Sequence, residues 1–103
     1  MSVLLEFSLF PTDVGESKSE YVAKSIQIIQ DSGISYKMGP MGTTLEGEWD
    51  EVMGVVKQCF DQMSKSSNRI YAGIKVDYRA GKSGRLVSKI ESIEKKTGKQ
   101  VNT

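Results

Sequence analysis

The sequence contains no histidine and only one cysteine. The missing histidine excludes His-based acid–base catalysis, Ser-His-Asp and Cys-His nucleophile systems, and every zinc site that uses histidine. Cys59 alone allows neither an internal disulfide nor a thiolate metal cluster, and its place in an apolar helical stripe predicts a buried, inert thiol. We therefore expect no metal site, no required cofactor and no enzymatic activity.

Long apolar runs and an excess of charge are also missing. Fourteen basic residues against thirteen acidic ones give a net charge of +1, so no global field recruits nucleic acid or anionic lipid. No apolar run approaches the roughly 18 residues of a membrane span, and Glu6 interrupts the first apolar segment before a signal-peptide core forms. We expect a cytoplasmic protein that partners neither nucleic acid nor membrane.

The length of 103 residues, with 38% hydrophobic and 26% charged residues, predicts one globular domain over residues 1–103 that frays from about residue 97. Alternating and β-forming residues predict strands over 3–10, 34–37, 41–46 and 69–78. Apolar spacing predicts helices from a Ser17–Glu20 capping box to Gly33, over 48–63, and from Ser83 to Gly98.

This β-α-β-β-α-β order with an appended helix predicts an α+β, ferredoxin-like fold: a four-stranded antiparallel sheet, strands one and three central, two helices on one face. We call the other face the open face. Parity places on it Leu4, Glu6, Ser8, Phe10, Thr44, Glu46, Tyr71, Lys75 and Asp77. This mixture of carboxylates, hydroxyls and rings suits burial against a second subunit, either with a ligand enclosed or as a wet interface without one.

Several stretches carry a family resemblance. The most specific is Pro-Met-Gly-Thr-Thr-Leu-Glu-Gly-Glu at 40–48, followed by Asp-Glu-Val-Met at 50–53. Less specific agreement is found at 19–23, at 31–36, at 69–70 together with 74–79, and at 89–94. Over residues 4 to 94 the chain resembles the thiamine-binding protein family, the MTH1187/YkoF-like superfamily of small, formerly uncharacterised proteins.

The resemblance implies a ferredoxin-like subunit that assembles face to face into homodimers or homotetramers. It implies that thiamine, or its hydroxymethylpyrimidine half, is bound at the open face without catalysis, for sequestration or delivery. The family commonly has a Pro-Leu-Gly turn after the first strand. This chain has Pro11-Thr12-Asp13 there, so we carry over no ligand contact from that loop.

Ligand chemistry selects the candidate site residues. An aminopyrimidine is flat, with hydrogen-bond donors and acceptors on one edge, and thiazolium is a permanent cation, so a site needs polar groups, aromatic rings and a carboxylate. The candidates are Ser8, Thr43 and Thr44 for the polar edge, Phe10 and Trp49 for the rings, and Glu46 for the carboxylate.

Four of the candidates also have a structural interpretation or a geometric restriction. Thr44 fits an ordinary strand position, Trp49 fits the hydrophobic anchor of the second helix, and Glu46 fits an ion pair with Lys75, Arg69 or a partner chain. Parity puts Thr43 on the core side, so a ligand contact there needs a bulge or an approach from the strand end. The whole-protein alternative is a structural or regulatory homo-oligomeric interaction module without a small-molecule ligand.

Overall fold

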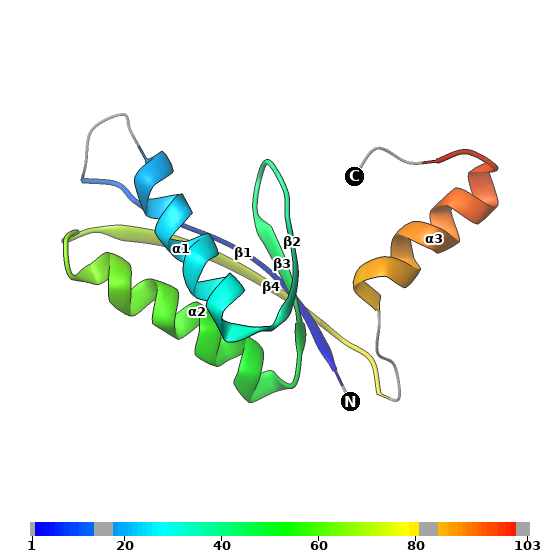
Figure 1. Cartoon of the computed structure of the whole chain (residues 1–103), viewed down its shortest axis with the longest axis horizontal. Coiled ribbons are helices and arrows are strands. Elements are labelled where there is room, and N and C mark those ends of the chain that lie inside the picture. The colour runs from blue at the N-terminus through cyan, green and yellow to red at the C-terminus, as the bar shows by residue number, and fades with distance from the viewer. Residues whose placement is uncertain (1, 14–17, 81–84, 101–103) are drawn as a thin grey trace.

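Two helices lie across one face of an antiparallel sheet, and a third stands at the C-terminal end of the molecule (Figure 1). This is a computed structural model, and it describes residues 2–13, 18–80 and 85–100. In chain order the elements are β1 (Val3–Pro11), α1 (Ser19–Ser32), β2 (Ser35–Met38), β3 (Thr43–Gly47), α2 (Trp49–Ser64), β4 (Ile70–Tyr78) and α3 (Arg85–Thr97).

The sheet has the strand order β2-β3-β1-β4, so the predicted ferredoxin-like α+β fold, with strands one and three central, is confirmed. β1 pairs with β4 along its whole length, from Val3 opposite Tyr78 to Pro11 opposite Ile70. It pairs with β3 only as far as Phe7. The second half of β1 therefore has a neighbouring strand on one side only.

The core lies between the sheet and the helices α1 and α2. The predicted parity of β1 is confirmed, since all its odd side chains up to Leu9 are buried, and Leu45 of β3 lies beside them. Each such side chain contributes about 1.5–3 kcal/mol through removal of its apolar surface from water. The helices supply the other half of the core, with Ile29, Val52, Val55, Val56, Cys59 and Met63.

The glycines predicted to end two helices do so. Gly33 and Gly98 follow α1 and α3 in the left-handed conformation, with φ of +74° and +73°. The capping box predicted over Ser17–Glu20 is wrong, because α1 begins at Ser19 with Lys18 at its N-cap and no side-chain cap. The candidate cap of the third helix, Ser83, lies outside the described residues.

β4 departs from the prediction that one of its faces packs on the core. Only Ile70 packs against the core, whereas Ile74 and Val76 are 43% and 41% exposed on the same side of the sheet. The reason is the placement of the helices: α2 contacts β1 and β3, and α1 contacts β1. The helix side of β4 therefore extends beyond the helices that would cover it.

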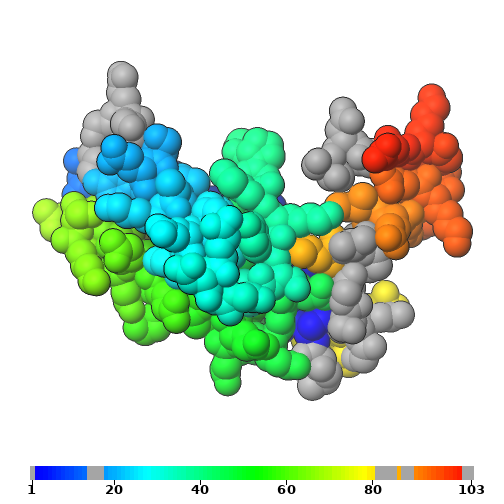
Figure 2. Space-filling view, viewed as in Figure 1, coloured from blue at the N-terminus to red at the C-terminus, as the bar shows by residue number. Residues whose placement is uncertain are grey.

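α3 partly covers what the sequence predicts to be an open face. It contacts β2 and β3, and the backbone N–H of Leu86 in its first turn donates to Oε1 of Glu46 at 3.3 Å. The rest of α3 stands clear of α1 and α2 and lengthens the molecule to 45 Å (Figure 2). Within the described ranges, no helix is long and apolar enough to cross a membrane.

Asp13 joins the end of β1 to the segment that leads into β4. Its carboxylate accepts hydrogen bonds from the Ser67 hydroxyl and, at 2.7 Å, from the backbone N–H of Asn68. These bonds, the one from Ser67 above all, hold the pKa of Asp13 below its ordinary value. The ionised form is therefore favoured by folding.

We expect stability to fall in acid through Asp13. Since its pKa is lower in the folded than in the unfolded state, the stabilisation is complete above the unfolded value of 3.8 and is lost as the pH falls through the folded value. Asp13→Asn should melt lower at pH 7 and show a shallower loss of melting temperature between about pH 5 and pH 2. An unchanged pH profile would contradict this role.

A second prediction concerns the turn that precedes β3. A Cβ atom added at Gly42 would meet the backbone oxygen of Phe7 at 3.0 Å. Gly42→Ala should therefore cost about 1–3 kcal/mol in urea unfolding followed by circular dichroism. Gly54, inside α2, has nothing within 4 Å of the same added atom, so Gly54→Ala should instead stabilise by about 0.5–1 kcal/mol. Equal effects of the two changes would show that the turn is free to move.

Candidate functional site

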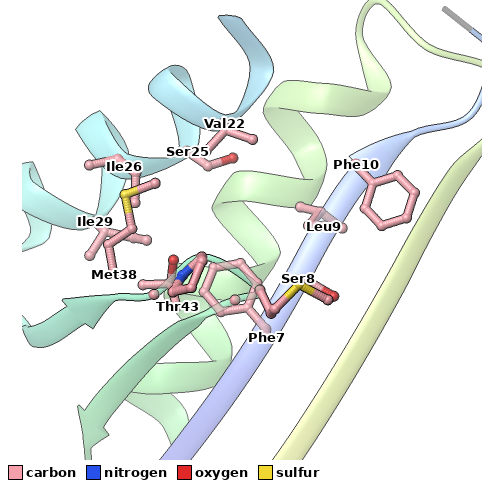
Figure 3. A pocket seen from close by; sticks show the side chains of 14 residues that line it. Phe7, Ser8, Leu9, Phe10, Val22, Ser25, Ile26, Ile29, Met38 and Thr43 are labelled. Carbon is pink, nitrogen blue, oxygen red and sulfur yellow. The ribbon is translucent and has the colours of Figure 1, made fainter. Parts of the chain in front are cut away.

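A cavity of about 340 Å³ opens between α1, the second half of β1 and the hairpin that joins β2 to β3 (Figure 3). Side chains of α1 form one wall, including Val22, Ile26 and Ile29. Phe7 and Leu9 lie on the wall opposite, and residues 38–43 close one end. The volume falls at the lower end of the roughly 300–1,000 Å³ that is usual for small-molecule pockets.

The cavity exists because β3 begins opposite the middle of β1 and leaves the second half of β1 without a neighbour on that side. Gly39 and Gly42 flank a tight hairpin loop, in which the Gly39 N–H donates to the Gly42 oxygen at 2.8 Å. β3 then begins at Thr43, opposite Phe7. The 41–46 prediction placed the strand two residues earlier. The space that two further residues would fill beside β1 is therefore left to the cavity.

Two buried hydroxyl groups belong to the cavity wall. Ser25 on α1 and Thr43 on β3 are each 8% exposed and both line the cavity. In the part of the chain that the structure describes, the Thr43 hydroxyl has no hydrogen-bond partner, whereas the Ser25 hydroxyl interacts with the Cys59 thiol. Because buried polar groups in folded proteins nearly always have a partner, the Thr43 hydroxyl marks a place where a ligand or water supplies one.

The main chain of β1 offers further polar groups. On the β3 side its ladder ends at Phe7, while Ser8, Leu9 and Phe10 continue along the cavity. Along an antiparallel strand, N–H and C=O groups are directed alternately to the two sides, so part of this edge carries donors and acceptors that no β3 residue pairs. A flat heterocycle lying beside β1 would meet these groups together with the hydroxyls.

Phe10 lines the cavity, but its ring has other partners. The ring is directed away from the α1 side chains and toward β4, as Figure 3 shows, and its centroid lies 5.4 Å from that of Tyr71. The Lys18 ammonium lies 4.8 Å from the same ring. A thiazolium seated on Phe10 would compete with this lysine, so the structure gives the ring a cation–π partner from its own chain.

Glu46 is placed apart from the cavity. It is buried beneath the start of α3, where it accepts hydrogen bonds from the Ser2 hydroxyl at 3.0 Å and from the Leu86 N–H. A carboxylate in this position complements the partial positive charge of a helix N-terminus. The structure thus gives Glu46 a role in anchoring α3.

The two remaining candidates also lie outside the cavity lining. Thr44 lies on the open face opposite Glu6, and it is half-buried. Trp49 is the first residue of α2 and follows the far end of β3. It is 53% exposed, so it is not the buried anchor considered as its alternative role. The cavity therefore brings together Ser8, Phe10 and Thr43, and leaves Thr44, Glu46 and Trp49 elsewhere.

Ser25 was not among the sequence candidates. It lies three residues after Val22 and four before Ile29, so it interrupts the apolar stripe of α1 with a hydroxyl. That interruption is the signal that would have identified it. Met38 and Met41, which are exposed at the rim, come from the same hairpin as Thr43.

Among the described residues, the side chains that line the cavity carry no formal charge. The Glu6 side chain lies beside Gly42 on the open face, just outside the cavity. Cys59 lies behind Ser25, with its sulfur 3.7 Å from the Ser25 carbonyl oxygen. Burial raises the pKa of this thiol, so it stays protonated and inert, as the sequence predicts. Within the described ranges, no three acidic or cysteine side chains gather as a metal site would require.

The elements and the pocket together define a small ferredoxin-like domain with a cavity between α1, β1 and the β2–β3 hairpin. Residues 5–94 match the sequence model of the family described as thiamine-binding protein. The chain belongs to this family, as its resemblance at Pro40–Glu48 implies.

Known relatives support this membership. The UPF0045 protein Mb1933 of Mycobacterium bovis is 38% identical over 96 residues, 92% of this chain and 94% of the relative. The crystal structure of the hypothetical protein MJ1052 of Methanocaldococcus jannaschii superposes with a TM-score of 0.82 and 29% identity, covering 89% and 95% of the two chains. The crystal structure of a Thermotoga maritima protein provisionally assigned to thiamine biosynthesis or salvage superposes with a TM-score of 0.78 and 26% sequence identity. The match covers 90% of this chain and 99% of that protein.

The anchoring role of Glu46 is testable. Glu46→Ala removes the acceptor for both the Ser2 hydroxyl and the Leu86 N–H, so unfolding in urea should show a loss of about 1–3 kcal/mol. Glu6→Ala is the matched control, because Glu6 is an exposed carboxylate on the same sheet face, and it should change stability by less than about 0.5 kcal/mol. Equal losses would remove Glu46 from this role.

Proposed function

We propose that the protein binds thiamine or its hydroxymethylpyrimidine half in this cavity, without catalysis, for sequestration or delivery. One observation carries the proposal. The buried hydroxyl of Thr43 has no partner in the described part of the chain, and it belongs, with the hydroxyl of Ser25, to a cavity that the family motif at residues 40–43 helps to build. Membership of the thiamine-binding family supplies the ligand class.

The chemistry of the lining favours the pyrimidine half inside. An aminopyrimidine is neutral and flat, with alternating donors and acceptors along one edge. The hydroxyls and the free edge of β1 supply matching groups, while Ile26, Ile29 and Phe7 supply apolar contact. Thiazolium is a permanent cation, so it belongs outside the uncharged lining, toward Glu6 on the open face.

The proposal is for binding alone because of the side chains that line the cavity. Serine and threonine hydroxyls do not exchange protons readily near neutral pH without an adjacent base. The described residues of the cavity walls carry no carboxylate, amine or phenol. The ligand would therefore be held and released unchanged.

We include a second copy of the chain in the proposal. α3 covers part of the β2 and β3 side of the open face, but the β1 and β4 side still presents a mixture of Leu4, Glu6, Phe10, Tyr71 and Lys75. Ser8 and Phe10 belong to this face and also line the cavity. A twin subunit packed face to face would therefore enclose the cavity mouth together with the mixed surface.

Calorimetric titration tests the proposal directly. Hydroxymethylpyrimidine and thiamine should both bind, and mass spectrometry should recover them unchanged. Thr43→Val and Ser25→Ala should each weaken binding roughly tenfold, the loss expected when one hydrogen bond of about 1–1.5 kcal/mol disappears.

Thr44→Val is the matched control for Thr43→Val, because it makes the same change one residue along β3, outside the cavity lining. It should leave affinity within about twofold. If neither ligand releases heat at millimolar concentration with folded protein, the proposal fails and an interaction module without a ligand remains. If Thr44→Val weakens binding more than Thr43→Val, the ligand sits elsewhere.

A further inference from the structure

Two methionines at the rim of the cavity are exposed, although methionine is usually a core residue. Met38 is 58% exposed and Met41 is 87% exposed, and both line the cavity. By contrast, Met63 is buried, and Met53 packs against the core. Within the described ranges, Met38 and Met41 are therefore the sulfur-bearing side chains that combine access to solvent with a place in the cavity wall.

Met38 has the closer relation to the cavity interior. It is the last residue of β2 and lies opposite Thr43, so the two side chains share the helix side of the sheet. Figure 3 shows the Met38 side chain beside Ile26 and Ile29 of α1. A flat ligand that bonds to the Thr43 hydroxyl and packs on this wall would lie against the Met38 thioether. Such sulfur–aromatic contacts are favourable.

We propose that Met38 is an oxidation site, at which a peroxide converts the thioether to a sulfoxide and thereby lowers the affinity of the cavity for its ligand. This inference rests on the proposed function, because the cavity must bind a ligand for the oxidation to have an effect. The twin subunit of that proposal packs on the open face. Met38 lies on the opposite side of the sheet, so such an assembly leaves its sulfur accessible.

The reaction needs no partner other than the peroxide. A lone pair of Sδ attacks one oxygen of hydrogen peroxide, so that an S–O bond forms while the O–O bond breaks. The proton on the transferred oxygen moves to the departing hydroxide, which leaves as water. Sulfur loses two electrons and the peroxide gains them. A dithiol reverses the step: the sulfoxide oxygen leaves as water while the two thiols form a disulfide, as in methionine sulfoxide reductases.

The sulfoxide makes one part of an apolar wall polar. A thioether packs beside Ile26 and Ile29 at little cost, whereas a sulfoxide oxygen accepts hydrogen bonds strongly and loses those from water when it is covered. A ligand seated against Met38 would force that burial. The oxidised protein should therefore bind the ligand more weakly than the untreated protein.

Met41 separates accessibility from effect. It is more exposed than Met38, so peroxide should oxidise it at least as fast. Because so little of its surface is covered, its oxidation should change the affinity much less. Cys59 does not compete for the oxidant, since its thiol is fully buried and burial raises its pKa.

Peroxide treatment followed by calorimetric titration with hydroxymethylpyrimidine tests the site. Peptide mass spectrometry should locate the added oxygen at Met38 and Met41 before it appears at Met53 or Met63. Once Met38 is oxidised, the affinity should fall about tenfold, and methionine sulfoxide reductase with dithiothreitol should restore it. Equal affinities of the treated and untreated proteins would overturn the proposal.

The substitution Met38→Leu assigns the effect to one residue. Leucine has nearly the volume of methionine but forms no sulfoxide, so the ratio of affinities before and after peroxide should be close to one in this variant, whatever its starting affinity. Met41→Leu is the matched control, the same change on the same hairpin, and its ratio should remain about ten. Sensitivity kept in Met38→Leu, or lost in Met41→Leu, would contradict the assignment.

Ligand protection gives a second readout in the unsubstituted chain. Saturating hydroxymethylpyrimidine covers the Met38 sulfur, so it should slow oxidation there by about fivefold or more and leave the rate at Met53 unchanged. Equal rates at Met38 with and without ligand would also overturn the proposal. If the untreated protein binds no ligand, the proposed function fails and the oxidation site with it, whereas binding that resists oxidation removes the oxidation site alone.

Discussion

The late start of β3 is the constraint on which the site depends. The hairpin at Gly39 and Gly42 turns tightly against β1, with Gly42 close to the Phe7 oxygen. β3 therefore pairs with only the first half of β1, while β4 pairs with all of it. A ferredoxin-like sheet of equal strands would fill the space beside Ser8 to Phe10. Here that space is a cavity, bordered by one strand edge, one helix and one turn.

The cavity gives the family motif a physical meaning. Its proline, methionine and glycine form the turn, and Thr43 is the first strand residue, buried with a hydroxyl directed to no partner in the described chain. Ser25 faces the same space from α1. Glu46, later in the motif, anchors α3 instead. One short segment thus serves two purposes, a cavity wall at one end of β3 and a helix anchor at the other.

The sequence predicts the fold well because its signals are local. Alternation in β1 identifies which side chains are buried, and Gly33 and Gly98 stop helices through backbone geometry alone. What it does not predict depends on tertiary placement. Alternation cannot show that the helices stop short of Ile74 and Val76, and the narrow stripe of α3 does not reveal that this helix covers Glu46.

The site is predicted only in part for the same reason. Parity places Ser8 and Phe10 on the open face and Thr43 on the core side of the sheet. The three residues can therefore line one cavity only if a ligand reaches Thr43 from the end of its strand. The structure provides that approach. Thr44, Glu46 and Trp49 follow from the assumption that the whole open face is one site, whereas α3 and the length of β3 divide it.

The central claim is that the ligand lies at the end of β3, beside the free edge of β1. The most direct measurement is the change in backbone amide NMR shifts as hydroxymethylpyrimidine is added. The account predicts that the largest changes fall on Ser8, Leu9, Ser25 and Thr43, with Trp49 little affected. Changes centred on Glu46 and Trp49, or none at saturating ligand, would contradict it.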